Sequence, residues 1–159
     1  MSAVHVALAD AVATERAGGA LAVALEGGMQ LQLHGDLGAG KTTLVRGMLR
    51  ALGHRGPVKS PTYAVVEHYI FSSLYFYHFD FYRFAEPGEW ETAGFSEYFR
   101  SDAVCVVEWP QKVAGMLPTA DLSLTLAMHE DGAPGRSLSA HAHSAAGERA
   151  LRMLRSACA

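Results

Sequence analysis

Residues 35–42 constrain the fold of this chain more than any other stretch. They read Gly-Asp-Leu-Gly-Ala-Gly-Lys-Thr and match the phosphate-loop pattern G-x-x-x-x-G-K-S/T at every fixed position. An alternation of apolar and polar residues over 29–34 precedes the loop, and a helix-like run over 43–52 follows it. A glycine-rich loop between a strand and a helix predicts an α/β fold with a phosphate-binding site.

Each residue type in this loop has a physical role. Glycines let the backbone curve around an anion without a clash from Cβ atoms, and the amides of the loop and of the helix N-terminus face negative oxygens. Lys41 supplies a charge for the β- and γ-phosphates, and Thr42 supplies a hydroxyl to Mg²⁺. The residues expected to bind the nucleotide are Asp36, Leu37, Gly38, Ala39, Gly40, Lys41, Thr42 and Thr43.

Composition bounds the class of protein. A length of 159 residues favours one domain over 1–159, and half of the residues are hydrophobic, as in a soluble globular protein. No apolar run approaches the ~20 residues that span a bilayer, and no secretion signal is recognisable, so a cytoplasmic protein is expected. Two isolated cysteines suit a reducing compartment. A net charge of −3 argues against DNA binding or general nucleic-acid binding.

Local patterns predict the remaining elements. A helix is expected over 11–25 with Asp10 as its N-cap, although Gly18 and Gly19 weaken it by about 1 kcal/mol each. The strand over 29–34 carries Gln30 and Gln32, so one of its faces is expected to be wet or lightly covered. Further expectations are hairpins over 63–82 and 122–143, short helical turns over 86–100, a buried strand over 103–107 and a helix over 147–158.

Three polar residues outside the loop are candidates for the chemistry. Glu108 follows the buried strand and is placed like the metal-side carboxylate of a phosphate-loop protein, where it would act directly or through water. Thr62 follows Pro61 and is either a switch residue that senses the γ-phosphate or a turn-capping hydroxyl. Asp80 either orients or deprotonates an attacking water, supports the metal, or forms a structural pair with Arg83.

Other side chains carry weaker signals. Trp109 either covers the site or packs at the rim of the core, and Arg136 is a candidate support for adenine or phosphate. His78 shares a strand face with Asp80, but a packed strand histidine is favoured over a metal ligand. A solvated helix face is favoured over a binding patch for the basic residues Arg46, Arg50, Arg55 and Lys59.

Four segments together resemble the TsaE (YjeE) family. They are Gly35 to Thr43, Val58 to Tyr63, Tyr77 to Arg83 and Val107 to Pro110, in the order and spacing of that family. The resemblance implies a P-loop fold with a mixed, partly antiparallel sheet flanked by helices, and ATP and Mg²⁺ as ligands. It also implies that the chain acts with TsaD and TsaB, which transfer threonylcarbamoyl to tRNA, and that ATP hydrolysis resets their complex, so contact with tRNA is indirect.

Other phosphate-loop classes fit less well. A small-molecule kinase usually carries arginines in a lid after the metal-side strand, whereas Lys112 is the one basic residue between Glu108 and Arg136. A GTP-binding switch would use an Asn-Lys-x-Asp segment, which the sequence lacks. A nucleotide-gated scaffold without useful hydrolysis stays open as a third alternative.

Overall fold

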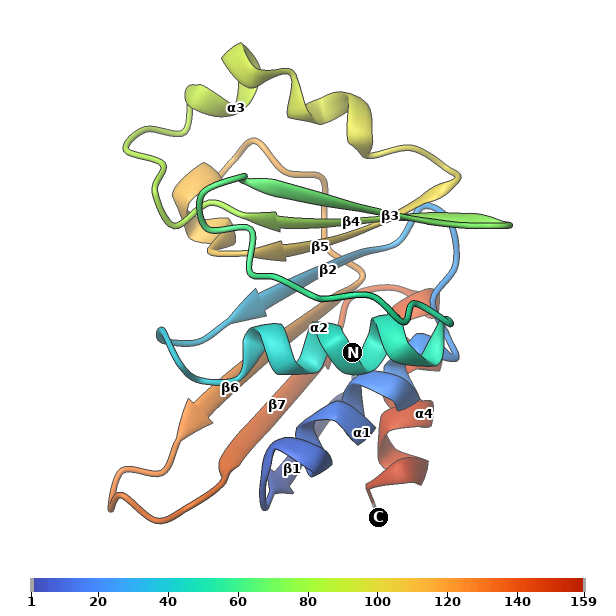
Figure 1. Ribbon diagram of the computed structural model, residues 1–159, viewed down its shortest axis with the longest axis vertical. Coiled ribbons are helices and arrows are strands. Elements are labelled where there is room, and N and C mark those ends of the chain that lie inside the picture. The colour runs from blue at the N-terminus through green and yellow to red at the C-terminus, as the bar shows by residue number, and fades with distance from the viewer. Residues whose placement is uncertain (1, 159) are drawn as a thin grey trace.

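Strands of alternating or continuous apolar character assemble into one seven-stranded sheet. The computed structural model describes residues 2–158. Its strands lie in the order β1-β7-β6-β2-β5-β4-β3 (Figure 1). The strands are β1 (Ala3–Leu8), β2 (Gln30–His34), β3 (Val66–Phe71), β4 (Leu74–Asp80), β5 (Ala103–Glu108), β6 (Leu122–Met128) and β7 (Arg136–Ala142). The helices are α1 (Ala11–Ala22), α2 (Lys41–Ala51), α3 (Glu89–Ala93) and α4 (Ala145–Ala157), with short 3-10 turns η1 (Phe95–Tyr98) and η2 (Pro110–Val113).

The centre of the sheet is parallel and its flanks are antiparallel. β2 pairs in parallel with β5 and β6, and β4 pairs in parallel with β5. The β3–β4 and β6–β7 hairpins are antiparallel, which confirms both predicted hairpins and the mixed α/β sheet. Because β2, β4 and β5 are parallel, their carboxyl ends meet at one edge, where α/β proteins bind ligands.

The structure differs from the sequence-based predictions at two places in the sheet. The first hairpin begins at Val66 rather than Tyr63, because residues 62–64 form a turn and Tyr63 is 82% exposed. β1 has no counterpart among the predicted elements; it lies at the edge of the sheet and pairs antiparallel with β7. A six-residue edge strand that pairs with a single neighbouring strand has a weak local signal in the sequence.

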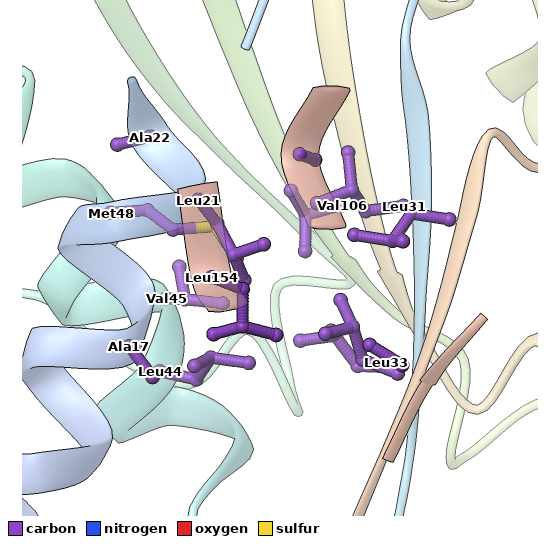
Figure 2. Close-up of a cluster of buried hydrophobic side chains, with 14 of the residues drawn as sticks. Ala17, Leu21, Ala22, Leu31, Leu33, Leu44, Val45, Met48, Val106 and Leu154 are labelled. Carbon is purple, nitrogen blue, oxygen red and sulfur yellow. The ribbon is translucent and has the colours of Figure 1, made fainter. Parts of the chain in front are cut away.

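Helices α1, α2 and α4 supply one layer of the main core. Leu44, Val45, Met48 and Leu49 of α2 are fully buried, as predicted, and they belong to the same cluster as Leu31 and Leu33 of β2. Figure 2 shows α1 and α2 side chains facing Leu31, Leu33 and Val106 across this layer. Packing of this kind anchors α2, and therefore its N-terminus, against the central strand of the sheet.

Glycines allow α1 and α2 to cross closely. A Cβ atom added at Gly18 of α1 would lie 2.1 Å from Leu44 O, and one added at Gly47 of α2 would lie 2.1 Å from Glu15 O. Gly18, one of the two glycines that weakened the prediction of α1, is therefore required by packing. Its cost in helix propensity, about 1 kcal/mol, is offset by the close contact of the two helices.

The opposite face of the sheet is covered by aromatic residues and a connector. Phe79 of β4 and Phe81, which follows that strand, pack with Trp90 of α3 and Cys105 of β5. Burial raises the pKa of the Cys105 thiol to about 12. Gln30 is 3% exposed and donates to Pro118 O at 2.9 Å, and Gln32 donates to Gln30 Oε1 at 2.7 Å. The polar face of β2 is therefore partly covered, because the connector supplies an acceptor for Gln30 and Gln30 supplies one for Gln32.

Candidate functional site

The loop between β2 and α2 carries amide groups that have no acceptor among the residues that the structure describes. Gly40 precedes α2 with φ of +108°, a conformation that favours glycine, and α2 has no side-chain capping bond. Four successive amides donate to no acceptor within residues 2–158: those of Gly40, Lys41, Thr42 and Thr43. Unpaired donors at a helix N-terminus bind anions such as phosphate, so the arrangement fits the phosphate group that the loop sequence implies.

The ammonium group of Lys41 is buried at the base of this loop. Its Nζ atom donates to Gly35 O at 2.5 Å, lies 3.8 Å from Glu108 Oε1 and stands 4.1 Å from the centre of the Trp109 ring. Desolvation lowers the pKa of Lys41, while the carboxylates of Glu108, Asp80 and Asp36 oppose that shift. The positive charge is thus held beside the free amides and is only partly compensated by protein groups.

Two carboxylates lie side by side at the carboxyl ends of β4 and β5. Asp80 and Glu108 are partners in the parallel register of these strands, and they are 3% and 2% exposed. Nε2 of His78 lies 2.5 Å from Glu108 Oε2. The predicted acids are therefore adjacent, and Glu108 faces Lys41 of the loop.

The Ser-Pro-Thr segment is tied to the same edge. Thr62 Oγ1 donates to Asp80 Oδ2 at 3.2 Å and lies 2.9 Å from Ser60 Oγ. Asp80 N donates to Val65 O at 2.9 Å, so backbone and side-chain bonds both join this segment to β4. No ion pair joins Asp80 to Arg83 within the described range; Arg83 instead lies 4.2 Å from the centre of the Tyr63 ring.

Two hollows open on either side of the loop. One, of about 220 Å³, is lined by Leu37, Gly38, Gly40, Lys41, Thr42, Thr43 and Glu108. The other, of about 180 Å³, is lined by Asp10, Ala11, Thr14, Gly38, Gly40, Thr43, Gly135 and Arg136. Arg136 Nη2 donates to Gly38 O at 3.2 Å, which brings this arginine to the loop. The space around the loop is therefore large enough for more than a single phosphate.

The sequence of this chain matches the model of a known protein family. The family model described as threonylcarbamoyl adenosine biosynthesis protein TsaE matches residues 8–138. The chain belongs to the TsaE family. The matched range contains the phosphate loop, Thr62, Asp80, Glu108 and Arg136, so both hollows lie within the family domain.

Relatives of known name carry the same family description. The chain is 49% identical over 106 residues to the tRNA threonylcarbamoyladenosine biosynthesis protein TsaE of Haemophilus influenzae, covering 67% of each chain. It is 41% identical over 96 residues to the protein of that name from Bacillus subtilis, covering 60% of each chain. The crystal structure of Bacillus subtilis YdiB matches with a TM-score of 0.81 at 27% identity, over 98% of this chain and 95% of that one.

Some features of this TsaE-family site were not predicted. Asp10 and Thr14 line the second hollow, although Asp10 was predicted only as the N-cap of α1, where it accepts from Ala13 N at 2.9 Å. His78 packs on its strand as predicted, but its bond to Glu108 was missed. The sequence offered one indication of this bond: His78 lies two residues before Asp80 and therefore shares its strand face.

Two kinds of structural feature are absent from residues 2–158. No three His, Cys, Asp or Glu side chains converge as a metal-binding group within residues 2–158. A Mg²⁺ site built from one hydroxyl and one carboxylate does not require such a group, because magnesium keeps several waters. Within the same residues, no helix is long and apolar enough to cross a membrane.

Replacing Asp80 by asparagine should stabilise the free protein at neutral pH. Burial raises the pKa of Asp80 above its usual 3.8 and the charge of Glu108 adds to that shift, while bonds from Tyr82 N and Thr62 oppose it. A group whose pKa rises on folding contributes stability below its unfolded pKa and loses that contribution as pH rises through the folded value. We expect Asp80→Asn to melt above the parent at pH 7, with the difference shrinking toward pH 4.

Thermal unfolding across that pH range measures the effect. Asp131→Asn is the matched control, because Asp131 is exposed on the turn between β6 and β7. A gap in melting temperature that is constant with pH would show that ionisation of Asp80 is not its cause.

Proposed function

We propose that this chain binds Mg-ATP and hydrolyses it slowly, in support of tRNA threonylcarbamoyladenosine modification. The observation that carries the proposal is the row of unpaired amides from Gly40 to Thr43, together with buried Lys41 and Glu108, in one hollow. Donors and charge of this kind suit a triphosphate better than a neutral ligand. Since all seven strands belong to one sheet, we treat residues 1–159 as a single ATPase domain.

In the proposal, the loop binds the phosphates, and Thr42 and Glu108 bind the metal ion. Residues Asp36 to Thr43 hold the phosphates, and Lys41 neutralises the β- and γ-phosphate oxygens. Thr42 and Glu108 hold Mg²⁺, directly or through water, because hydroxyl and carboxylate oxygens are its preferred ligands. A bound Mg²⁺ would neutralise the negative charge that develops on the phosphoryl oxygens.

Asp80 and Thr62 act next to this centre in the proposal. A cation bound nearby would keep Asp80 ionised against the effect of burial, and its carboxylate, which Tyr82 N holds at 2.9 Å, orients the attacking water. Thr62 bonds to Asp80 and so joins its loop to the site. It senses the γ-phosphate, and its loop changes order in response. Both residues position groups, which is the main requirement of phosphoryl transfer.

The second hollow is suited to the nucleoside. It lies across the loop from Glu108 and is lined by Asp10, Thr14 and Arg136, which offer a carboxylate, a hydroxyl and a guanidinium group. A ribose and an adenine need hydrogen-bonding groups of these kinds. Arg136 also supports Gly38 through its carbonyl group, so it acts on the loop as well as on the ligand.

Hydrolysis by the isolated chain should be slow. No arginine lines the hollow that contains Lys41 and Glu108, and Arg136 lines the hollow on the other side of the loop. An arginine finger contributes about 10³–10⁵ in rate, and we therefore expect fewer than about one turnover per second for the chain alone. Phosphate release from Mg-ATP measures this rate. A basal rate in the tens per second would contradict the expectation.

We further propose that hydrolysis resets a TsaD–TsaB complex, which itself contacts the tRNA. Purified TsaD, TsaB and tRNA, with a preformed threonylcarbamoyl donor, should complete repeated rounds of modification only when this chain and hydrolysable ATP are added. A non-hydrolysable ATP analogue should support no more than one round. Repeated rounds with the analogue would favour a nucleotide-gated scaffold over the ATPase.

A further inference from the structure

His78 is a fully buried residue of β4 with a single hydrogen-bond partner. Its side chain is 0% exposed, and its Nε2 atom lies 2.5 Å from Glu108 Oε2. The other ring nitrogen, Nδ1, is buried and has no partner within residues 2–158. A buried polar atom without a partner lowers stability. An apolar side chain would therefore suit this position better if packing were its only role.

The strand register explains how His78 reaches Glu108. In the parallel pair of β4 and β5, Asp80 lies beside Glu108 and His78 lies beside Val106. Side chains two residues apart share a strand face, so His78 lies on the same face as both acids, one residue pair further from the edge of the sheet. The Glu108 side chain is held between this ring and the loop.

The two oxygens of Glu108 have different neighbours. Oε2 is bound to His78, whereas Oε1 lies 3.8 Å from Lys41 Nζ. A carboxylate only accepts hydrogen bonds, so Nε2 of His78 carries a hydrogen and donates it to Glu108 Oε2. This bond restrains rotation of the carboxylate and leaves Oε1 directed toward Lys41 and the free amides of the loop.

We propose that His78 is a positioning residue that orients the Glu108 carboxylate for Mg²⁺. The inference rests on the proposed function, because it concerns the ion that Glu108 holds there. Residues that hydrogen-bond a metal ligand fix its orientation, and their loss typically costs about 10- to 100-fold in metal affinity or activity. The unpaired Nδ1 atom is accounted for in the same way, since histidine is retained here for the single bond that it makes.

Two substitutions separate positioning from packing. His78→Leu keeps an apolar volume but removes the donor, whereas His78→Gln keeps an N–H group at a similar distance from the backbone. We expect His78→Leu to weaken Mg²⁺ binding in the presence of ADP by about 10- to 100-fold, with ADP affinity in EDTA within about twofold of the parent. His78→Gln should recover most of the loss. Isothermal titration calorimetry of each protein with Mg²⁺ and ADP measures these affinities.

A double-mutant cycle tests whether His78 acts through Glu108. In a Glu108→Ala background, adding His78→Leu should produce no further loss of Mg²⁺ affinity, because the carboxylate that it orients is absent. Additive losses, equal losses in the Leu and Gln variants, or parental Mg²⁺ binding by His78→Leu would each overturn the inference. Circular dichroism confirms that each variant is folded.

The parent protein distinguishes a failure of this inference from a failure of the proposed function. If the parent binds neither ATP nor ADP with Mg²⁺, the proposed function fails, whatever the variants do. Nitrogen-15 chemical shifts of the His78 ring in the nucleotide-free parent still test the hydrogen bond. Protonation at Nε2 supports the inference, and protonation at Nδ1 alone overturns it.

Discussion

Replacing Lys41 by alanine should nearly abolish nucleotide binding while the fold is retained. Lys41 is 5% exposed and lines the same hollow as the loop amides that have no acceptor within residues 2–158, so in the proposed complex it faces phosphate with little competing water. Truncating one member of a buried charge pair costs about 2–5 kcal/mol, which corresponds to roughly 30- to 4,000-fold in affinity.

Ligand-induced thermal stabilisation provides the measurement for Lys41→Ala. Mg-ATP at 100 times its dissociation constant stabilises a protein by about 2.7 kcal/mol, or roughly 5–10 °C in melting temperature for a domain of this size. The parent should show this shift and the variant should show almost none. Lys59→Ala, which removes a cation from the exposed loop after α2, is the control and should respond like the parent. A parental shift in Lys41→Ala would refute the role assigned to Lys41.

Replacing Glu108 by glutamine should strongly reduce hydrolysis and weaken the dependence of the remaining turnover on Mg²⁺. The amide keeps the volume of the side chain and can still accept a hydrogen bond from His78, but it carries no charge for the ion or for Lys41 at 3.8 Å. Charge stabilisation by a bound metal is worth several kcal/mol in a transition state, and we therefore expect turnover to fall by about 10²-fold or more.

For ATP affinity in the absence of metal, we expect Glu108→Gln to have the opposite effect. Glu108 repels a triphosphate when no Mg²⁺ is present, so in EDTA the variant should bind ATP as tightly as the parent or more tightly. Titrating Mg²⁺ against turnover and against ATP affinity measures both effects. Glu130→Gln, an exposed substitution on the turn between β6 and β7, controls for loss of a negative charge. Equal loss of ATP affinity with and without Mg²⁺ would argue that Glu108 is structural.

Buried charges at this edge of the sheet oppose the stability of the free protein. Burial raises the pKa of Asp80 and lowers that of Lys41, which means that each group is less easily charged here than in water. A ligand that brings negative phosphate to Lys41 and a cation to the carboxylates would relieve both. Stabilisation by Mg-ATP is therefore the shared consequence of the roles proposed for these residues.

Short-range patterns were sufficient for much of the fold. The phosphate loop could be recognised because its glycines and lysine are adjacent in the chain, and the inward face of α2 because four apolar residues recur at helical spacing. Glu108 was predicted at a strand end because an apolar run stops there. Such features depend on residues within a few positions of one another. Local patterns did not predict β1, a short edge strand that is stabilised by pairing with β7, about 130 residues away along the chain.

By itself, the sequence determined the strand, loop and helix that form the phosphate cradle, the acids expected beside it and the resemblance to the TsaE family. Tertiary structure alone decided which distant residues meet: His78 with Glu108, Thr62 with Asp80, and Arg136 with Gly38. It also decided that the polar face of β2 is partly covered. The physical reason is that strand order and register bring together residues far apart in the chain, whereas periodicity reports only on neighbours along the chain.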